Sequence, residues 1–219
     1  MTIESLKNEA GNTVGAANEN GLMTEKINKI SKKADLVNPS WEQRGYIQIY
    51  TGNGKGKTTA SLGLAMRALG RNWKVLLIMF TKGGDNYGEL VSFRNLSPEI
   101  KNNLTIEQAG LNRIVYCHNR CEDDDKEIKR GWELAKKAIE NNEYQLIILD
   151  EVNIAIDMKI LDVKEVVEVL KNKPENMEIV LTGRNAHPKV IEIAHLVSKI
   201  EPVKHYWDKG ISARQGIEY

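Results

Sequence analysis

The stretch "GYIQIYTGNGKGKTTASLGLAMRALG", residues 45–70, decides the fold. Its apolar start predicts a strand, the glycine-rich middle predicts a tight loop, and residues 57–69 predict a helix. In this order, the loop amides and the helix N-terminus converge on one point and bind a phosphate group. The usual pattern G-x-x-x-x-G-K-[ST] has glycine at its first position. Here Thr51 stands there, so the loop departs from the pattern at one place.

The rest of the chain alternates short apolar runs with helical segments, as α/β proteins do. Runs such as 75–80 and 146–149 are apolar on both faces, which is typical of parallel strands covered by helices. We therefore expect the fold class α/β, P-loop NTPase-like, with a mostly parallel sheet, helices on both faces and ligands at the carboxyl edge. The predicted strands begin at residues 46, 74, 104, 144, 178 and 195, and the best-defined helices are 57–69, 123–141, 162–170 and 188–194.

Composition and charge limit the classes of partner. The 219 residues are 41% hydrophobic and carry 31 basic against 30 acidic side chains, so no net field draws the protein to nucleic acid or a membrane surface. No apolar run approaches the roughly 18 residues of a membrane span, and no secretory signal is visible. We expect a cytoplasmic protein that acts on small molecules, with a polar N-terminal extension at 1–44 and a folded domain at 45–219.

The two cysteines raise the question of a metal site. Cys117 and Cys121 lie four residues apart with His118 between them, which resembles half of a zinc site. A matching second half is missing, so two free thiols are the favoured interpretation.

Lys57 and Thr58 carry the chemistry predicted for the loop. Gly52, Gly54 and Gly56 lack a Cβ, which lets consecutive amides turn toward one anion. Lys57 supplies a positive charge for phosphate oxygens, and the Thr58 hydroxyl is the expected magnesium ligand.

A magnesium-nucleotide site also needs an acid at the end of a buried strand. The run "LIILDE" places Asp150 and Glu151 there. One of the two carboxylates could instead cap the helix that follows, and spacing does not decide which one contacts the metal. Two chemistries remain open at this point: Glu151 could orient water for hydrolysis, or the triphosphate could be the leaving group of an attack elsewhere on the nucleotide.

Several motifs together resemble the ATP:corrinoid adenosyltransferases of the CobA/BtuR/CobO type, over residues 45–219. A general P-loop ATPase would share only the loop and the acid pair. The motifs are "TGNGKGKTTA" at 51–60, "RALG" at 67–70, "FTKG" at 80–83, "GE" at 88–89, "LDE" at 149–151, "LTGR" at 181–184 and "PVKHYWDKGISARQGIEY" at 202–219.

The resemblance implies an activity and a site. The family carries threonine at the first loop position and holds ATP in the reverse sense, so that the ribose 5′ carbon faces attack by the Co(I) of a corrinoid and tripolyphosphate leaves whole. Lys57 and Glu151 are the implied catalytic residues, and Thr58 and Glu151 hold Mg²⁺. The implied contacts to ATP are Asn53, Gly54, Lys55, Gly56, Lys57, Thr58, Thr59 and Arg184.

The resemblance also implies partners. The acceptor is cobalamin or a precursor, with cob(I)yrinic acid a,c-diamide as the type substrate, and the electron comes from a donor such as a reduced flavoprotein. The family pairs as a homodimer in which an N-terminal segment covers the partner's nucleotide site. Residues 24–44 could play this part, or the extension 1–44 is a partly disordered leader. The family-like ending suggests that the C-terminal segment, with Asp208 and Gly210, folds back near the site or serves the fold alone.

One stretch departs from the family. Better-known members carry Gly-Phe-Thr-Trp on the corrinoid side, where the aromatics favour reduction of Co(II). The corresponding residues here are Gly110, Leu111, Asn112 and Arg113. The nucleotide half of the resemblance is therefore stronger than the corrinoid half. The alternatives are a P-loop ATPase or small-molecule kinase with Glu151 as the water-orienting base, and a carrier that binds without turnover.

Overall fold

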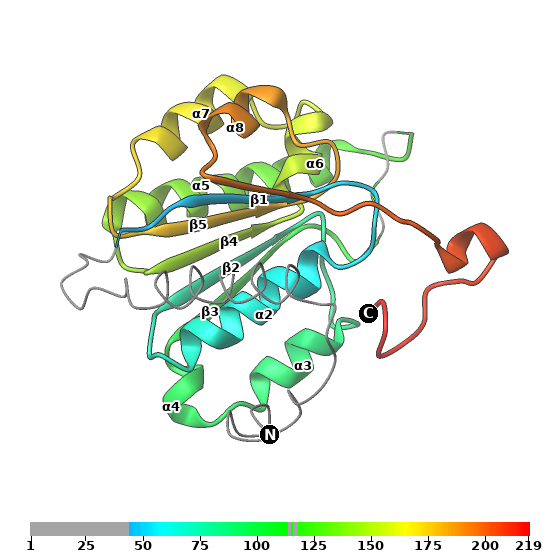
Figure 1. The fold of residues 1–219 in the computed structure, drawn as a ribbon, viewed down its shortest axis with the longest axis horizontal. Helices are drawn as coiled ribbons and strands as arrows, with labels where there is room; N and C mark the ends of the chain where they lie inside the picture. The colour runs from blue at the N-terminus through cyan, green and yellow to red at the C-terminus, as the bar shows by residue number, and fades with distance from the viewer. Residues whose placement is uncertain (1–43, 114, 116–117) are drawn as a thin grey trace, which may run out of the picture. The chain divides into compact units, whose positions relative to one another are not determined.

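The computed structural model of the protein describes residues 44–113, 115 and 118–219. All but the last residue of the predicted extension 1–44 lies outside this part, as does Cys117. The described chain forms one six-stranded sheet of order β3-β2-β4-β5-β1-β6, in which every neighbouring pair is parallel (Figure 1). The strands are β1 (Ile47–Thr51), β2 (Val75–Phe80), β3 (Leu104–Ala109), β4 (Leu146–Asp150), β5 (Glu178–Thr182) and β6 (Leu196–Lys199).

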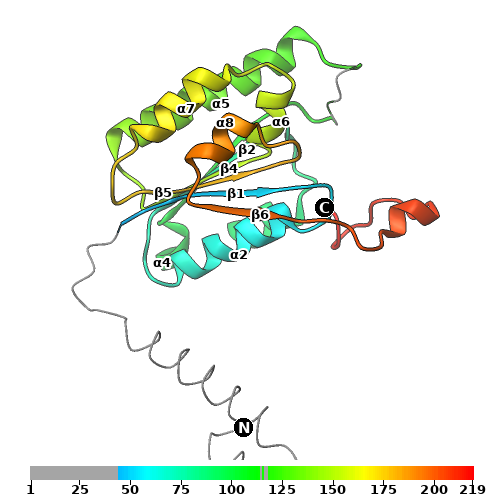
Figure 2. The ribbon, with the colours of Figure 1, turned by 45° about the horizontal axis from the view of Figure 1, so that its top comes forward.

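Helices cover both faces of the sheet, so the predicted fold class is confirmed. Figures 1 and 2 show α2 and α4 on one face and α5, α6, α7 and α8 on the other. No helix in the described part is long and apolar enough to cross a bilayer. The helices are α2 (Lys57–Leu69), α3 (Gly88–Arg94), α4 (Pro98–Lys101), α5 (Glu122–Asn141), α6 (Val152–Asp157), α7 (Val163–Lys171), α8 (Pro188–Ile193) and the 3-10 helix η2 (Tyr206–Lys209).

The four best-defined predicted helices correspond to α2, α5, α7 and α8, with ends that differ by one residue at most. Helices α3, α4 and α6 were not predicted from the sequence. These helices have four to seven residues, which is too short for an apolar period to repeat.

Strand β2 shows why the apolar runs have no polar face. Its side chains alternate between two cores: Ile78 and Phe80 pack on the α5 side, with Trp132. Leu77 and Met79 pack on the α2 side. Because both faces are buried, every position of the strand is apolar, as expected for a parallel sheet.

The parallel arrangement brings all strand carboxyl ends to one edge. The strand before the phosphate loop, β1, and the strand with the acid pair, β4, are not neighbours, because β5 lies between them and pairs with both. The residue at the end of β5, Thr182, is therefore placed between the loop and the acids.

At Gly131, helix α5 lies so close to the sheet that there is no room for a side chain. A Cβ at this position would lie 2.3 Å from the Ala109 Cβ and 3.2 Å from the Phe80 ring. Although alanine is the better helix former, Gly131→Ala should lower the free energy of unfolding by about 1–3 kcal/mol, because the core there is already full. The matched control is Gly63→Ala on α2, where nothing lies within 4 Å. That variant should gain about 0.4–1 kcal/mol in urea unfolding. An equal gain in both variants would contradict the close approach.

Candidate nucleotide site

The backbone of the loop explains how threonine occupies its first position. Thr51 still belongs to β1, and its hydroxyl accepts a hydrogen bond from the Ala186 amide at 3.2 Å. Gly52 takes the left-handed backbone, with φ of +98°, and a Cβ there would lie 2.4 Å from the Ile200 carbonyl oxygen. The Gly54 amide donates to the same carbonyl at 2.8 Å. The loop thus packs directly against Ile200, in the chain that follows β6. This close contact requires glycine at position 52, one residue later than in the usual pattern.

Lys57 is folded under the loop. Its ammonium donates to the carbonyl oxygens of Gly52 and Gly54, both at 2.9 Å, and the residue is only 7% exposed. Burial lowers the pKa of Lys57 below its usual value, and the carboxylate of Glu151 opposes part of that shift. The charge predicted for phosphate oxygens therefore lies inside the loop.

Asp150 is the centre of the acid cluster. It is fully buried, and its Oδ1 accepts hydrogen bonds from the Thr58 hydroxyl at 2.9 Å and the Thr182 hydroxyl at 2.6 Å. Its Oδ2 accepts a hydrogen bond from the Lys82 ammonium at 2.7 Å. Burial alone would lower the pKa of Lys82, but the nearby carboxylates, Asp150 foremost, together outweigh this and raise it.

Sequence reasoning missed Lys82 and Thr182 as individual site residues. Lys82 lies in the quoted motif "FTKG", two residues beyond the end of β2, and Thr182 is the last residue of β5. Both positions follow buried strands of a parallel sheet, where ligand contacts are expected. That signal was available in the sequence, but it did not show which strand ends meet.

Glu151 is held in an unfavourable environment. Its backbone is left-handed, with φ of +61°, and its amide donates to Thr182 Oγ1 at 2.9 Å. The side chain does not cap α6, and its buried Oε2 has no hydrogen-bond partner among the described residues. Burial, reinforced by Asp150, raises the pKa of Glu151. A buried carboxylate oxygen without a partner is suited to bind a cation.

The residues predicted to bind nucleotide gather around one cavity of about 660 Å³. In the described part of the chain, no three His, Cys, Asp or Glu side chains are grouped so that they could hold a metal ion together, so a metal here would use few protein ligands. The cavity is lined by Asn53, Gly54, Lys55, Gly56, Lys57, Thr58, Thr59, Leu62, Lys82, Tyr87, Gly88, Glu89, Ser92, Glu151, Arg184, His205, Tyr206, Gly216, Ile217, Glu218 and Tyr219.

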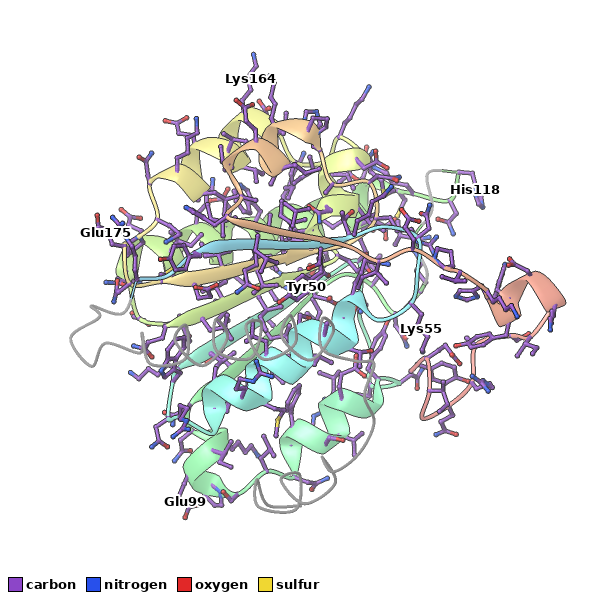
Figure 3. All side chains as sticks on the ribbon, viewed as in Figure 1. Tyr50, Lys55, Glu99, His118, Lys164 and Glu175 are labelled. Atoms are coloured by element: carbon purple, nitrogen blue, oxygen red, sulfur yellow. The ribbon has the colours of Figure 1, made fainter. Side chains whose placement is uncertain are left out.

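The C-terminal segment forms the second wall of this cavity. Figure 3 shows Lys55 on the loop beside this segment, and its ammonium donates to the Ile217 carbonyl at 2.6 Å and to Glu218 at 3.1 Å. Glu218 also accepts hydrogen bonds from the Tyr206 hydroxyl and from the Arg214 amide, and these hold its pKa down at about 2. The segment does fold back near the loop, but through residues 205–206 and 216–219.

Asp208 and Gly210, which the sequence singled out, do not line the cavity. Asp208 belongs to η2, and Gly210 ends it in a left-handed conformation. Asp208 and Gly210 instead belong to the turn after which the chain returns toward the phosphate loop.

Leu111 and Arg113 do not line the cavity either. The Arg113 guanidinium forms an ion pair with buried Asp124 at the start of α5 and donates to the Asn119 carbonyl at 2.9 Å. Arg113 therefore fastens the segment before α5. The segment also packs tightly against the turn after β2, since a Cβ at Gly83 would lie 2.3 Å from the Gly110 carbonyl.

Comparisons with known proteins point to one family. A sequence model described as "ATP:corrinoid adenosyltransferase BtuR/CobO/CobP" matches residues 43–219. The corrinoid adenosyltransferase of Escherichia coli (strain K12) is 34% identical over 192 residues, covering 87% of this chain and 94% of that protein. An uncharacterized protein of Nostoc sp. (strain PCC 7120) is 37% identical over 183 residues, covering 79% of this chain. The matched part spans 48% of the Nostoc protein, about half its length.

Among solved structures, domain III of the replication initiation protein DnaA from Thermotoga maritima is similar over 87% of this chain and 65% of that chain. The sequence identity to that domain is 15% and the TM-score is 0.38.

The raised pKa of Glu151 predicts a pH-dependent stability. Between the ordinary value of 4.5 and the raised value, the folded state binds more protons than the unfolded state, so stability falls as pH rises. Glu151→Gln removes this titration, and its gain in unfolding free energy over the original protein should grow from pH 4 to pH 8 in urea melts without metal. Glu192→Gln, on the exposed face of α8, is the matched neutralisation away from the site. A constant difference across this range would contradict the buried charge.

We expect that Glu218 keeps the C-terminal segment folded against the phosphate loop. Glu218→Gln removes the charge that holds Tyr206, Arg214 and Lys55 together, so the wall should loosen at neutral pH. Trypsin should then cleave after Lys209 and Arg214 several-fold faster than in the original protein, as read by mass spectrometry. Glu201→Gln, which removes a surface ion pair with Lys199, should leave those cleavage rates unchanged. Equal rates in both variants would show that Glu218 does not anchor the wall.

Proposed function

Because this chain belongs to the ATP:corrinoid adenosyltransferase family BtuR/CobO/CobP, we infer that it transfers the 5′-deoxyadenosyl group of ATP to the cobalt of a corrinoid. One observation carries the proposal: the phosphate loop and the family-like C-terminal ending, far apart in sequence, form the two walls of one cavity. An enzyme that only hydrolyses a terminal phosphate does not need this second wall.

The loop serves the leaving group. In the transfer, a cobalt–carbon bond forms, the bond between C5′ and its oxygen breaks, and the electron pair leaves with tripolyphosphate. The amides of the loop, the N-terminus of α2 and Lys57 all direct positive charge at the place where this negative charge develops. Each such preorganised donor contributes about 10²–10³ in rate in comparable sites.

The residues present fit Mg²⁺. Hard oxygen ligands are available in the Thr58 hydroxyl and in the buried, unpaired Oε2 of Glu151, and Asp150 orients Thr58 through a hydrogen bond. We propose that Thr58 and Glu151 hold the ion and that Asp150 acts through Thr58. Bound there, magnesium supplies charge neutralisation for the triphosphate. The residues around it fix the direction in which the leaving oxygens point.

The nucleophile needs no help from a base. Co(I) attacks carbon without losing a proton, so the protein has to position the 5′ carbon and exclude competing water. Glu151 is therefore not needed as a base in this reaction, which supports the proposal that it binds the metal. A second candidate function, a P-loop ATPase or kinase, rests on the same residue, because a partly buried carboxylate with a raised pKa is also suited to orient water or a hydroxyl.

The finer points of the proposal follow the family. We propose ATP bound in the reverse sense, a cobalamin precursor of the cob(I)yrinic acid a,c-diamide type as acceptor, and a separate electron donor such as a reduced flavoprotein. We also propose a cytoplasmic homodimer. In it, the N-terminal extension 1–44 of one chain covers the nucleotide site of the other, and 45–219 is the catalytic domain.

The phosphate product separates the two functions. Incubation with ATP, Mg²⁺ and chemically reduced cobinamide or cobalamin should yield the adenosylated corrinoid and intact tripolyphosphate in equal amounts, as resolved by anion-exchange chromatography. Lys57→Met should lower kcat about 10²–10³-fold without changing the product. Orthophosphate as the product, or turnover of ATP that does not require corrinoid, would support the ATPase or kinase instead.

A further inference from the structure

Lys82 is held at the acid cluster by a strained turn. The residue before it, Thr81, has φ of +59°, a left-handed conformation that β-branched side chains rarely adopt. The strain is maintained by close packing, since a Cβ at Gly83 would meet the Gly110 carbonyl at 2.3 Å. Strain of this kind persists where the surrounding structure enforces it, often at functional sites. Here its effect is to turn Lys82 back over the sheet edge toward Asp150.

The ammonium of Lys82 lies close to oxygen atoms of Asp150 and Thr58, at the proposed metal site. Its Nζ is 2.7 Å from Asp150 Oδ2 and 3.5 Å from Thr58 Oγ1. It also lies 5.7 Å from the centre of the Tyr87 ring, and both side chains line the cavity. A monovalent ammonium and a divalent cation cannot both sit close to Thr58 and Asp150 without strong repulsion.

We propose that Lys82 is an exchangeable internal cation: it neutralises Asp150 until a metal–triphosphate binds, and it then moves from Asp150 to the triphosphate oxygens. The inference rests on the proposed function in so far as the ligand is a metal–triphosphate. It adds a positioning residue for the leaving group and a coupling between metal and phosphate binding.

The charges around Asp150 favour such an exchange. The carboxylates of Asp150 and Glu151 lie close to three positive charges, the ammoniums of Lys82 and Lys57 and the guanidinium of Arg184. A bound metal takes over the neutralisation of the acids, while the triphosphate brings a net negative charge that needs a new partner. Lys82 is suited to this role, because its side chain is 17% exposed and borders the cavity, whereas the Lys57 ammonium is already held by two loop carbonyls.

A purely structural ion pair is a weaker explanation. Asp150 Oδ1 already accepts two hydroxyl hydrogen bonds, from Thr58 and Thr182. Buried ion pairs rarely add net stability over apolar residues of the same size, so stability alone does not account for a lysine held here by a strained turn.

Two binding measurements on Lys82→Met test the proposal, because they should change in opposite directions. Without nucleotide, the variant should bind Mn²⁺ about fivefold or more tightly than the original protein, since the competing ammonium is gone. The readout is the loss of the EPR signal of free Mn²⁺. With Mg²⁺ present, the variant should bind tripolyphosphate about fivefold or more weakly in isothermal titration calorimetry.

A matched control distinguishes a specific role of Lys82 from the loss of one positive charge anywhere on the protein. Lys136→Met removes an ion-paired lysine on α5, which contacts Glu133 and Glu165 away from the cavity. It should change neither affinity. If Lys82→Met does not fold, as judged by circular dichroism, Lys82→Gln keeps a hydrogen bond to Asp150 without the charge, and the same two shifts are expected from it.

Other outcomes would overturn the proposal. Unchanged or weaker Mn²⁺ binding in a folded Lys82 variant would show that the ammonium does not compete with the metal. Unchanged tripolyphosphate binding would show that it does not reach the leaving group. Neither measurement uses a corrinoid. A protein that shows both shifts but makes no adenosylated corrinoid would therefore refute the proposed function and leave this inference standing.

Discussion

The structure depends on the buried carboxylate of Asp150. The Asp150 side chain is fully buried, and a buried carboxylate must be paired and hydrogen-bonded. An isolated buried charge would cost more free energy than the net stability of a folded domain. Its partners come from three places: Thr58 at the start of α2, Thr182 at the end of β5 and Lys82 after β2. Meeting this one requirement fixes the phosphate loop, the middle of the sheet edge and the turn after β2 relative to each other.

The neighbouring Glu151, unlike Asp150, is not fully hydrogen-bonded. It is partly buried beside Asp150, its backbone is left-handed, and one of its oxygens is buried and has no partner in the described structure. Each of these features costs free energy, and the raised pKa reports the same cost. A site that binds a cation and a polyanion gains by keeping such a group ready, because binding then relieves an unfavourable state. The structure thus satisfies the hydrogen-bonding needs of Asp150 and leaves one oxygen of Glu151 without a partner among the described residues.

The cavity above these acids has two unlike walls. The phosphate loop is held by backbone hydrogen bonds that join Gly54 and Thr51 to Ile200 beyond β6. The C-terminal wall depends mainly on side-chain contacts of Glu218 with Lys55 and Tyr206. The substitution of arginine for tryptophan at position 113 falls outside both walls, and its ion pair with Asp124 serves the segment before α5. The departure from the family pattern thus leaves the nucleotide cavity intact, and Arg113 has a structural task here.

The sequence by itself determined the six strands, the four longer helices and the phosphate loop, because each produces a local pattern of apolar residues and glycines. It also predicted residues that line the cavity, since a loop places its own neighbours together. Only the tertiary structure decided the strand order, and with it the position of Thr182 between loop and acids. The same holds for Lys82, which is 68 residues from Asp150, and for Lys55, which is 163 residues from Glu218. Contacts over such separations are set by which strand ends meet at the sheet edge and by where the chain returns to it, and no local pattern encodes either.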